Sequence, residues 1–228
     1  MPRFSQLARS CKSLPGRTII SIITFLIINS LIALTGVVCA FWLEKPSLFL
    51  KKTSGSLSLL SYFIFWPYFI LNTIALALFR LFSQKNALDE IIPNLYLGCQ
   101  LGIMDYKRFV SKGIKNTLDL TCEFGEIGFI RTRQNYFSIP LLDTTAPTLN
   151  QLNEAVSWIT THLEIGPVFV HCALGHGRSA TVVAAFLLKQ GTVNNVKEAI
   201  EFIQAKRARV ELHPKQLAVL EQFVHCCL

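Results

Sequence analysis

Two long stretches without a charged side chain dominate the first third of the chain. Residues 19–43 and residues 57–79 contain no Asp, Glu, Lys or Arg. About 20 apolar residues suffice to cross the hydrocarbon core of a bilayer. Helices of soluble domains keep a polar face, and neither stretch shows one. The pattern therefore predicts a hairpin of two transmembrane helices within residues 19–85, with a short loop at residues 44–56.

Basic residues flank both stretches and indicate the orientation of the hairpin. Cytoplasmic segments beside membrane spans carry an excess of Lys and Arg. Residues 1–18 form a basic N-terminal segment, and Arg80 and Lys85 follow the second stretch. Three lysines in the loop favour the opposite orientation, namely Lys45, Lys51 and Lys52. We expect an integral membrane protein with two spans, and with both termini in the cytosol.

The pattern changes at residue 86, where strand-like and helix-like runs begin to alternate. Thr148 and Gln151 form the S/T-x-x-E/Q capping pattern of a helix start, and Pro214 suits a first helical position. A hairpin-like edge element with a break at Pro93 is predicted at residues 91–98, and strands at residues 114–120, 136–139 and 168–170. Helices are predicted at residues 104–110, 148–163, 180–188, 196–203 and 214–223. This alternation predicts an α/β domain over residues 86–228.

Composition and charge narrow the class of protein. The chain of 228 residues is 51% hydrophobic and only 16% charged, which suits a membrane protein. The net charge of +8 has no aromatic-interleaved basic motif beside it, so we expect no nucleic-acid partner. Seven cysteines without C-x-x-C spacing indicate neither a disulfide framework nor a zinc site. A reducing compartment is the expected setting.

The predicted strand at residues 168–170 runs into the sequence HCALGHGRS, residues 171–179, and then into a run of small aliphatic residues. A strand, a glycine-bearing loop and a helix N-terminus together present free backbone N–H groups and the positive end of the helix dipole to one point. We expect this loop to bind a phosphate-sized anion. Its cradle residues are Ala173, Leu174, Gly175, His176 and Gly177.

Side chains within this stretch suit phosphoryl transfer. Cys172 lies where the helix dipole and Arg178 favour a nucleophilic thiolate. Arg178 offers a planar fork for two phosphoryl oxygens, and Ser179 is placed to hydrogen-bond the departing sulfur. His171 is expected to order the loop, or to be a satisfied core histidine. The stretch is not a nucleotide-binding loop, because Cys172 and Arg178 occupy the positions where that loop needs glycine and lysine. It is not a serine-hydrolase elbow either, because His176 occupies the position of the serine.

The stretch resembles the His-Cys-x5-Arg-Ser/Thr signature of the cysteine-dependent protein tyrosine phosphatases, and residues 86–223 resemble their dual-specificity branch. Residues 143–148 and 209–217 are similar to segments of the mitochondrial phosphatidylglycerophosphate phosphatase within that branch. The resemblance implies a central sheet flanked by helices. It also implies a phosphocysteine intermediate, with no cofactor and no metal.

A general acid must protonate the leaving oxygen from a separate loop. Asp143 is our candidate because it lies between a predicted strand and a capped helix, and the resembled family carries its acid at the matching place. Asp119 is the rival, although a strand-end hydrogen bond to backbone is its expected role. Asp89 and Asp105 are expected at the surface or in caps. Several basic side chains are expected to be solvated: Arg131, Arg133, Lys206, Arg207 and Arg209.

These residues predict a membrane-anchored phosphatase. Phosphoproteins rank first as expected substrates, because the resembled dual-specificity branch is broad. Phospholipids follow, either phosphatidylglycerophosphate or phosphoinositides, since the domain begins beside the second span and meets membrane lipids at high effective concentration. The neutral cradle residues place polyphosphoinositides last. A catalytically silent phosphate-binding membrane module is the remaining alternative.

Overall fold

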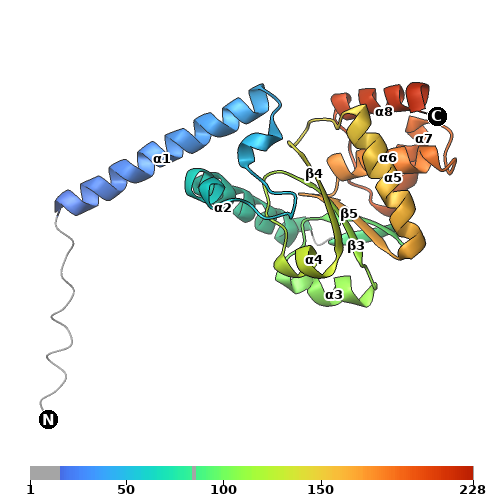
Figure 1. Cartoon of the computed structure of the whole chain (residues 1–228), viewed down its shortest axis with the longest axis horizontal. Helices are drawn as coiled ribbons and strands as arrows, with labels where there is room; N and C mark the ends of the chain where they lie inside the picture. The colour runs from blue at the N-terminus through green and yellow to red at the C-terminus, as the bar shows by residue number, and fades with distance from the viewer. Residues whose placement is uncertain (1–15, 84–85, 228) are drawn as a thin grey trace, which may run out of the picture.

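The computed structural model describes residues 16–83 and 86–227. Two long helices, α1 (Gly16–Trp42) and α2 (Leu59–Ser83), precede an α/β domain (Figure 1). Its strands are β1 (Leu88–Ile92), β2 (Leu95–Cys99), β3 (Asn116–Thr121), β4 (Asn135–Leu141) and β5 (Val168–Cys172). Its helices are α3 (Tyr106–Ser111), α4 (Gly128–Arg133), α5 (Leu149–Ile165), α6 (Arg178–Lys189), α7 (Val196–Lys206) and α8 (Pro214–Cys227). There are also two 3₁₀ turns among the described residues, η1 (Pro46–Phe49) between α1 and α2 and η2 (Ile103–Asp105) in the domain.

The five strands form one sheet in the order β1-β2-β5-β3-β4, with β5 at the centre. β1 pairs antiparallel with β2, and the other neighbours pair parallel. Parallel pairing brings the carboxyl ends of β2, β3, β4 and β5 to one edge of the sheet. In open α/β sheets ligands bind outside this edge. The loops that carry the candidate chemistry all follow these strand ends.

Helices cover both faces of the sheet. Val168 and Val170 of β5 belong to a core that includes α5, α6, α7 and α8, whereas Phe169 points to the opposite face and packs with Phe109 of α3. Burial on both faces explains why β5 is an unbroken apolar run. α6 is buried from Arg178 to Leu188 because small Ala and Val side chains permit close packing. The predicted α/β architecture is confirmed.

Most predicted elements of the domain are present, with boundaries that differ by a few residues. The Thr148–Gln151 capping box begins α5, and Pro214 is the first residue of α8, as expected. The short helix α4 was not predicted.

α1 and α2 confirm the two predicted apolar helices. Both are long and apolar enough to cross a membrane, judged by length and composition, and both leave most of their side chains exposed. α1 already begins at Gly16, and the predicted basic segment lies outside the described residues apart from its last three positions. Lys85 also lies outside them. The domain boundaries at residues 18 and 85 stay predictions.

The link between the two helices, residues 43–58, packs on the α/β domain. The buried Lys51 ammonium donates to Asp119 Oδ2 at 2.6 Å, to the Thr121 carbonyl at 2.7 Å and to Thr121 Oγ1 at 2.9 Å. The Gly55 carbonyl accepts a hydrogen bond from the Glu126 backbone N–H at 2.9 Å. The sequence predicted a short loop here but not its contacts with the α/β domain. A buried opposite charge attracts Lys51, and the residue pattern cannot reveal such a partner.

We predict that Lys51→Ala lowers the free energy of unfolding by about 3–5 kcal/mol, because it leaves the Asp119 carboxylate buried without its cation. Burial raises the pKa of Asp119, but the charges of Lys51 and His171 outweigh burial and hold that pKa at about 2. The measurement is denaturant unfolding of the full chain in detergent micelles.

The matched control is Lys52→Ala, which removes an exposed lysine one position along the link. A surface change of this kind shifts stability by at most about 0.5 kcal/mol. Equal stability of the two variants would show that the Lys51 ion pair does not hold the link.

Candidate active site

The loop between β5 and α6 has the cradle geometry expected from the sequence. Residues 173–177 turn from the strand end to the helix N-terminus, and Gly175 has a φ of +73°. A Cβ at Gly175 would collide with the carbonyl of Gly98 in the neighbouring strand. Only glycine therefore combines this backbone conformation with the close approach of the loop to β2.

Cys172 lies at the start of the loop and is 3% exposed. Its Sγ accepts hydrogen bonds from the Gly175 backbone N–H at 3.3 Å and from the Ser179 hydroxyl at 3.2 Å. Burial raises the pKa of the thiol, but the Arg178 charge and these hydrogen bonds outweigh burial, so the pKa is lower than that of an ordinary thiol. The arrangement favours the thiolate.

Arg178 begins α6 and is fixed by Glu123, which follows β3. The guanidinium makes a bidentate contact, with Nη2 at 2.6 Å from Glu123 Oε1 and Nη1 at 3.0 Å from Oε2. Nη1 also donates to the Leu141 carbonyl at 2.8 Å. The buried Nε has no hydrogen-bond partner among the described residues. Buried donors are rarely left unpaired, so this N–H points to a ligand oxygen.

Asp143 follows β4 and reaches the same place. Its Oδ1 lies 3.3 Å from Arg178 Nη2, and its side chain is 65% exposed. Gln216 of α8 stabilises the loop that carries Asp143, because its Nε2 donates to the Thr145 carbonyl at 2.9 Å. A Cβ at Gly177 would lie 3.0 Å from Gln216 Oε1, so the same amide packs against the cradle.

Three carboxylates in residues 119–126, here called the carboxylate segment, contact three cations around the site, and Asp119 Oδ1 also lies 3.9 Å from His171 Nε2. Asp119 binds Lys51 and Glu123 binds Arg178, while Glu126 Oε2 lies 2.9 Å from His171 Nε2. Burial lowers the pKa of His171, but Asp119 and Glu126 outweigh burial and raise it. His171 is therefore held as an imidazolium over a wider pH range, directly before the nucleophile.

Asp119, Glu126 and His171 lie within metal-binding distance of one another. Lys51 already donates to Asp119 there, so a metal ion would have to displace a buried lysine. The predicted backbone bond of Asp119 is confirmed, since its Oδ1 accepts from the Thr121 backbone N–H at 2.8 Å. This role in a buried network does not suit a general acid.

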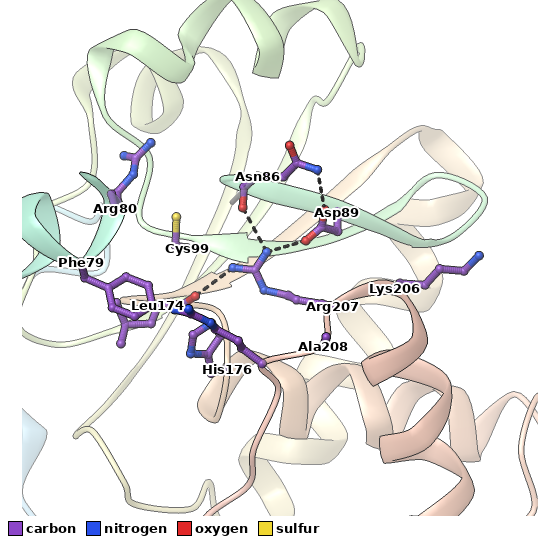
Figure 2. A pocket seen from close by; sticks show the side chains of 11 residues that line it. Phe79, Arg80, Asn86, Asp89, Cys99, Leu174, His176, Lys206, Arg207 and Ala208 are labelled. Carbon is purple, nitrogen blue, oxygen red and sulfur yellow. Dashed lines mark hydrogen bonds and ion pairs between the residues drawn. The ribbon is translucent and has the colours of Figure 1, made fainter. Parts of the chain in front are cut away.

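Arg207 corrects one expectation from the sequence. It is 8% exposed rather than solvated, and Figure 2 shows it between strand β1 and the cradle. Its Nε donates to the Gly175 carbonyl at 2.8 Å, its Nη2 to the Leu174 carbonyl at 2.9 Å, and its Nη1 to Asp89 Oδ2 at 2.6 Å. Arg207 therefore holds the outer side of the cradle, and Asp89 holds Arg207.

The other acidic and basic candidates take secondary roles. Asp105 accepts from the Gly102 backbone N–H at 2.7 Å, as expected of a cap, and also binds Arg80. Arg131 is half-buried and donates to the Glu126 carbonyl at 2.9 Å. Nothing is described of the Arg133 side chain. Lys206 and Arg209 line a cavity of about 340 Å³ beside His176, together with Phe79 of α2 (Figure 2).

A second cavity, of about 440 Å³, opens directly above the cradle between the domain and the apolar helices. Its polar side carries Glu123, Asp143 and Thr144, and its floor carries Ala173 and Leu174. The opposite wall belongs to α1 and α2 and comprises Phe41, Tyr68, Asn72, Ala75, Leu76 and Phe79. The candidate site is thus walled in part by residues of the predicted spans.

Comparisons with known proteins agree with this geometry. Residues 95–226 match the family model described as dual specificity phosphatase, catalytic domain. A phosphatidylglycerophosphate phosphatase of Arabidopsis thaliana, PTPMT2, is 30% identical over 166 residues, which cover 70% of this chain and 71% of the relative. The mouse phosphatidylglycerophosphatase and protein-tyrosine phosphatase 1 is 41% identical over 83 residues, which cover 35% of this chain and 42% of the relative.

The fold also matches solved structures. The crystal structure of PTPMT1 in complex with PI(5)P aligns with a TM-score of 0.56 at 24% identity. The alignment covers 61% of this chain and 96% of that one. At this identity the match supports the fold alone.

We predict that the pKa of Cys172, read from the pH dependence of inactivation by iodoacetamide, lies below the ordinary thiol value and rises in Ser179→Ala. A hydrogen bond to a charged group is worth about 1.5–3 kcal/mol. Since one pKa unit corresponds to about 1.4 kcal/mol, we expect an upward shift of about 1–2 units. Loss of phosphatase activity is the readout, because it reports on the catalytic thiol among the other cysteines.

Ser111→Ala is the control, because it removes a hydroxyl that bonds only to the Arg108 carbonyl on exposed α3. If the midpoint pH of inactivation is the same in Ser179→Ala as in the wild type, the Ser179 hydroxyl does not stabilise the thiolate.

Proposed function

Because the chain belongs to the dual-specificity phosphatase family and is a cysteine-based phosphatase, we propose that it is membrane-anchored and hydrolyses the phosphomonoester of a phospholipid headgroup. The observation that carries this proposal is the cavity above the cradle. One side bears the cradle residues Ala173 and Leu174, which suit a phosphate, with the candidate acid Asp143 beside them. The other side bears apolar residues of α1 and α2, which suit the glycerol and the first acyl carbons of a lipid.

The proposed mechanism uses Cys172, Arg178 and Asp143. The Cys172 thiolate attacks phosphorus, an S–P bond forms, and the P–O bond to the alcohol breaks. The Asp143 carboxyl gives its proton to the departing oxygen. Water then attacks the phosphocysteine and gives a proton to the Asp143 carboxylate. The S–P bond breaks, and the thiolate returns to the hydrogen bonds of Ser179 and Gly175.

Arg178 and the loop N–H groups stabilise the charge that spreads over the phosphoryl oxygens in both steps. Glu123 holds the guanidinium in place, so that its Nε and one edge of Nη2 face the ligand. His171 acts through the loop. It directly precedes Cys172 and lies against Glu126, which holds the start of the loop in place. The three groups of the mechanism thus lie together before substrate binds.

Phosphoproteins rank second, although the sequence alone placed them first. The mouse relative is described both as a phosphatidylglycerophosphatase and as a protein-tyrosine phosphatase, which keeps this substrate class open. The apolar wall formed by Leu76 and Phe79 offers a peptide few polar partners, and this reverses the order. The silent-module alternative has no support, because Cys172, Arg178 and Asp143 lie together.

The proposed location is an integral membrane protein with its catalytic domain in the cytosol. The free thiols of Cys99, Cys122 and Cys172 suit a reducing compartment. Apolar α1 and α2 supply the membrane attachment.

We predict that the full-length protein in mixed vesicles prefers phosphatidylglycerophosphate or a monophosphorylated inositol lipid over phosphotyrosyl peptides. The expected ratio in kcat/KM is at least about 100-fold, or about 2.7 kcal/mol of transition-state binding. Phosphate release is measured for each substrate at the same enzyme density. Cys172→Ser is the control, and it should abolish release from every substrate.

A preference for peptides in the same vesicles would contradict the lipid proposal but leave the phosphatase intact. Highest turnover on a polyphosphorylated inositol lipid would contradict the expected preference for singly phosphorylated headgroups.

A further inference from the structure

Both ends of α2 contact the same folded domain. Just before α2 begins, the Gly55 carbonyl binds the Glu126 backbone N–H, and Lys51 is buried against Asp119. At its other end, Arg80 Nη2 lies 2.6 Å from both carboxylate oxygens of Asp105. All three contacts are made at the edge of the sheet where the strands end.

The body of α2 also lies on the domain between these two ends. Tyr62 packs beside Gly125, where an added Cβ would lie 3.2 Å from its hydroxyl. The Phe79 ring lies 5.6 Å from the ring of His176, in an edge-on contact with the cradle. α2 therefore runs across the active-site edge of the domain along most of its length.

A helix in this position cannot cross a bilayer. The 25 residues of α2 span about 37 Å at 1.5 Å per residue, and the hydrocarbon core is about 30 Å thick. A crossing helix would put Gly55 and Arg80 on opposite sides of that core. The loops that bind both residues carry open polar backbone, which cannot lie in hydrocarbon.

The outer face of α2 is nevertheless apolar. Exposed side chains recur at helical spacing along its whole length: Leu60, Phe63, Ile70, Leu71, Ile74, Leu78, Leu81 and Phe82. Its inner face carries the polar side chains Ser61, Tyr68 and Asn72. A contiguous exposed apolar face of this length marks a surface that contacts lipid or another protein.

The contacts between α1 and α2 agree with this position. The Phe25 and Phe63 rings meet at a tilt, with centroids 6.4 Å apart, and Asn29 Nδ2 donates to the Phe63 carbonyl at 3.1 Å. The start of α2 thus lies beside the middle of α1. An antiparallel hairpin would pair Phe25 with the last part of α2. α1 extends away from the domain and is exposed on all sides over residues 19–28 (Figure 1).

We propose that the link and the catalytic domain lie on the same side of the bilayer. α2 lies in the interface with its outer face in lipid. This arrangement replaces the expected hairpin. It also removes the conflict over the basic residues of the link, because Lys45 and Lys52 then lie on the same membrane side as Arg80. The cavity above the cradle is held at headgroup level.

Side-specific labelling tests the first part of the proposal. Ser54→Cys places a thiol on the exposed part of the link, and Glu154→Cys places one on exposed α5 of the domain. Each variant is treated with an impermeant maleimide in intact cells and in inverted membrane vesicles, and mass spectrometry identifies the labelled peptide. Retained aryl phosphatase activity shows that both variants fold.

We expect positions 54 and 154 to be labelled in the same preparation and protected in the other. Labelling of position 54 in the preparation that protects position 154 would restore the hairpin and overturn the proposal. Neither result depends on which substrate the enzyme prefers.

Depth measurement tests the second part. Spin labels are attached to Leu60→Cys, Leu71→Cys and Leu81→Cys of the full chain in vesicles, and accessibility to oxygen and to a polar nickel complex reports depth. Leu71 is the midpoint of α2. An interfacial helix gives three similar, shallow depths. A deep central label between two shallow ones would show that α2 crosses the bilayer.

Discussion

Three carboxylates within residues 119–126, at the end of β3 and in the loop after it, neutralise three cations from distant parts of the chain, and the site depends on these pairs. Asp119 holds Lys51 of the link, Glu123 holds Arg178 of α6, and Glu126 lies against His171 of β5. Removing one partner of a buried pair is costly because it leaves an uncompensated charge. The carboxylate segment therefore joins the link, the phosphate-binding arginine and the loop of the nucleophile into one unit.

The same network sets the chemistry of the nucleophile. Cys172 is buried, and burial alone would keep its thiol protonated. Arg178 and the hydrogen bonds of the cradle reverse this preference, and both need neighbours in fixed positions. Glu123 fixes Arg178, and Arg207 fixes the backbone of Leu174 and Gly175 from outside. α2 completes the site by closing the cavity on its apolar side.

Sequence reasoning succeeded where the signal is local. The loop at residues 171–179 could be predicted because strand, glycines and helix start follow one another, and the α5 cap could be predicted from Thr148 and Gln151 alone. Asp143 was placed by its position between two elements, and it lies beside Arg178 as that placement requires.

Sequence reasoning failed where a residue's role depends on a partner far along the chain. Glu123, Glu126 and Gln216 were missed, Arg207 was taken for a solvated residue, and Lys51 was used only as a loop lysine that indicates orientation. Lys51 and Asp119 are 68 positions apart, and Arg207 and Asp89 are 118 apart. The one available signal was that Glu123 and Glu126 follow a predicted strand, at the sheet edge where parallel strands end. Position at that edge identifies candidates but not the cation that each one binds.

The central claim is that phosphate passes through Cys172 and that Asp143 controls its release. The most direct test is rapid acid quenching of Asp143→Asn during turnover of an aryl phosphate, whose good leaving group needs no acid. We expect phosphate to accumulate on the Cys172 peptide, close to one per active site, because the base for hydrolysis is missing. The same experiment with Cys172→Ser, Asp143→Asn should give none. Turnover without a phosphorylated Cys172, or phosphate on another residue, would contradict the account.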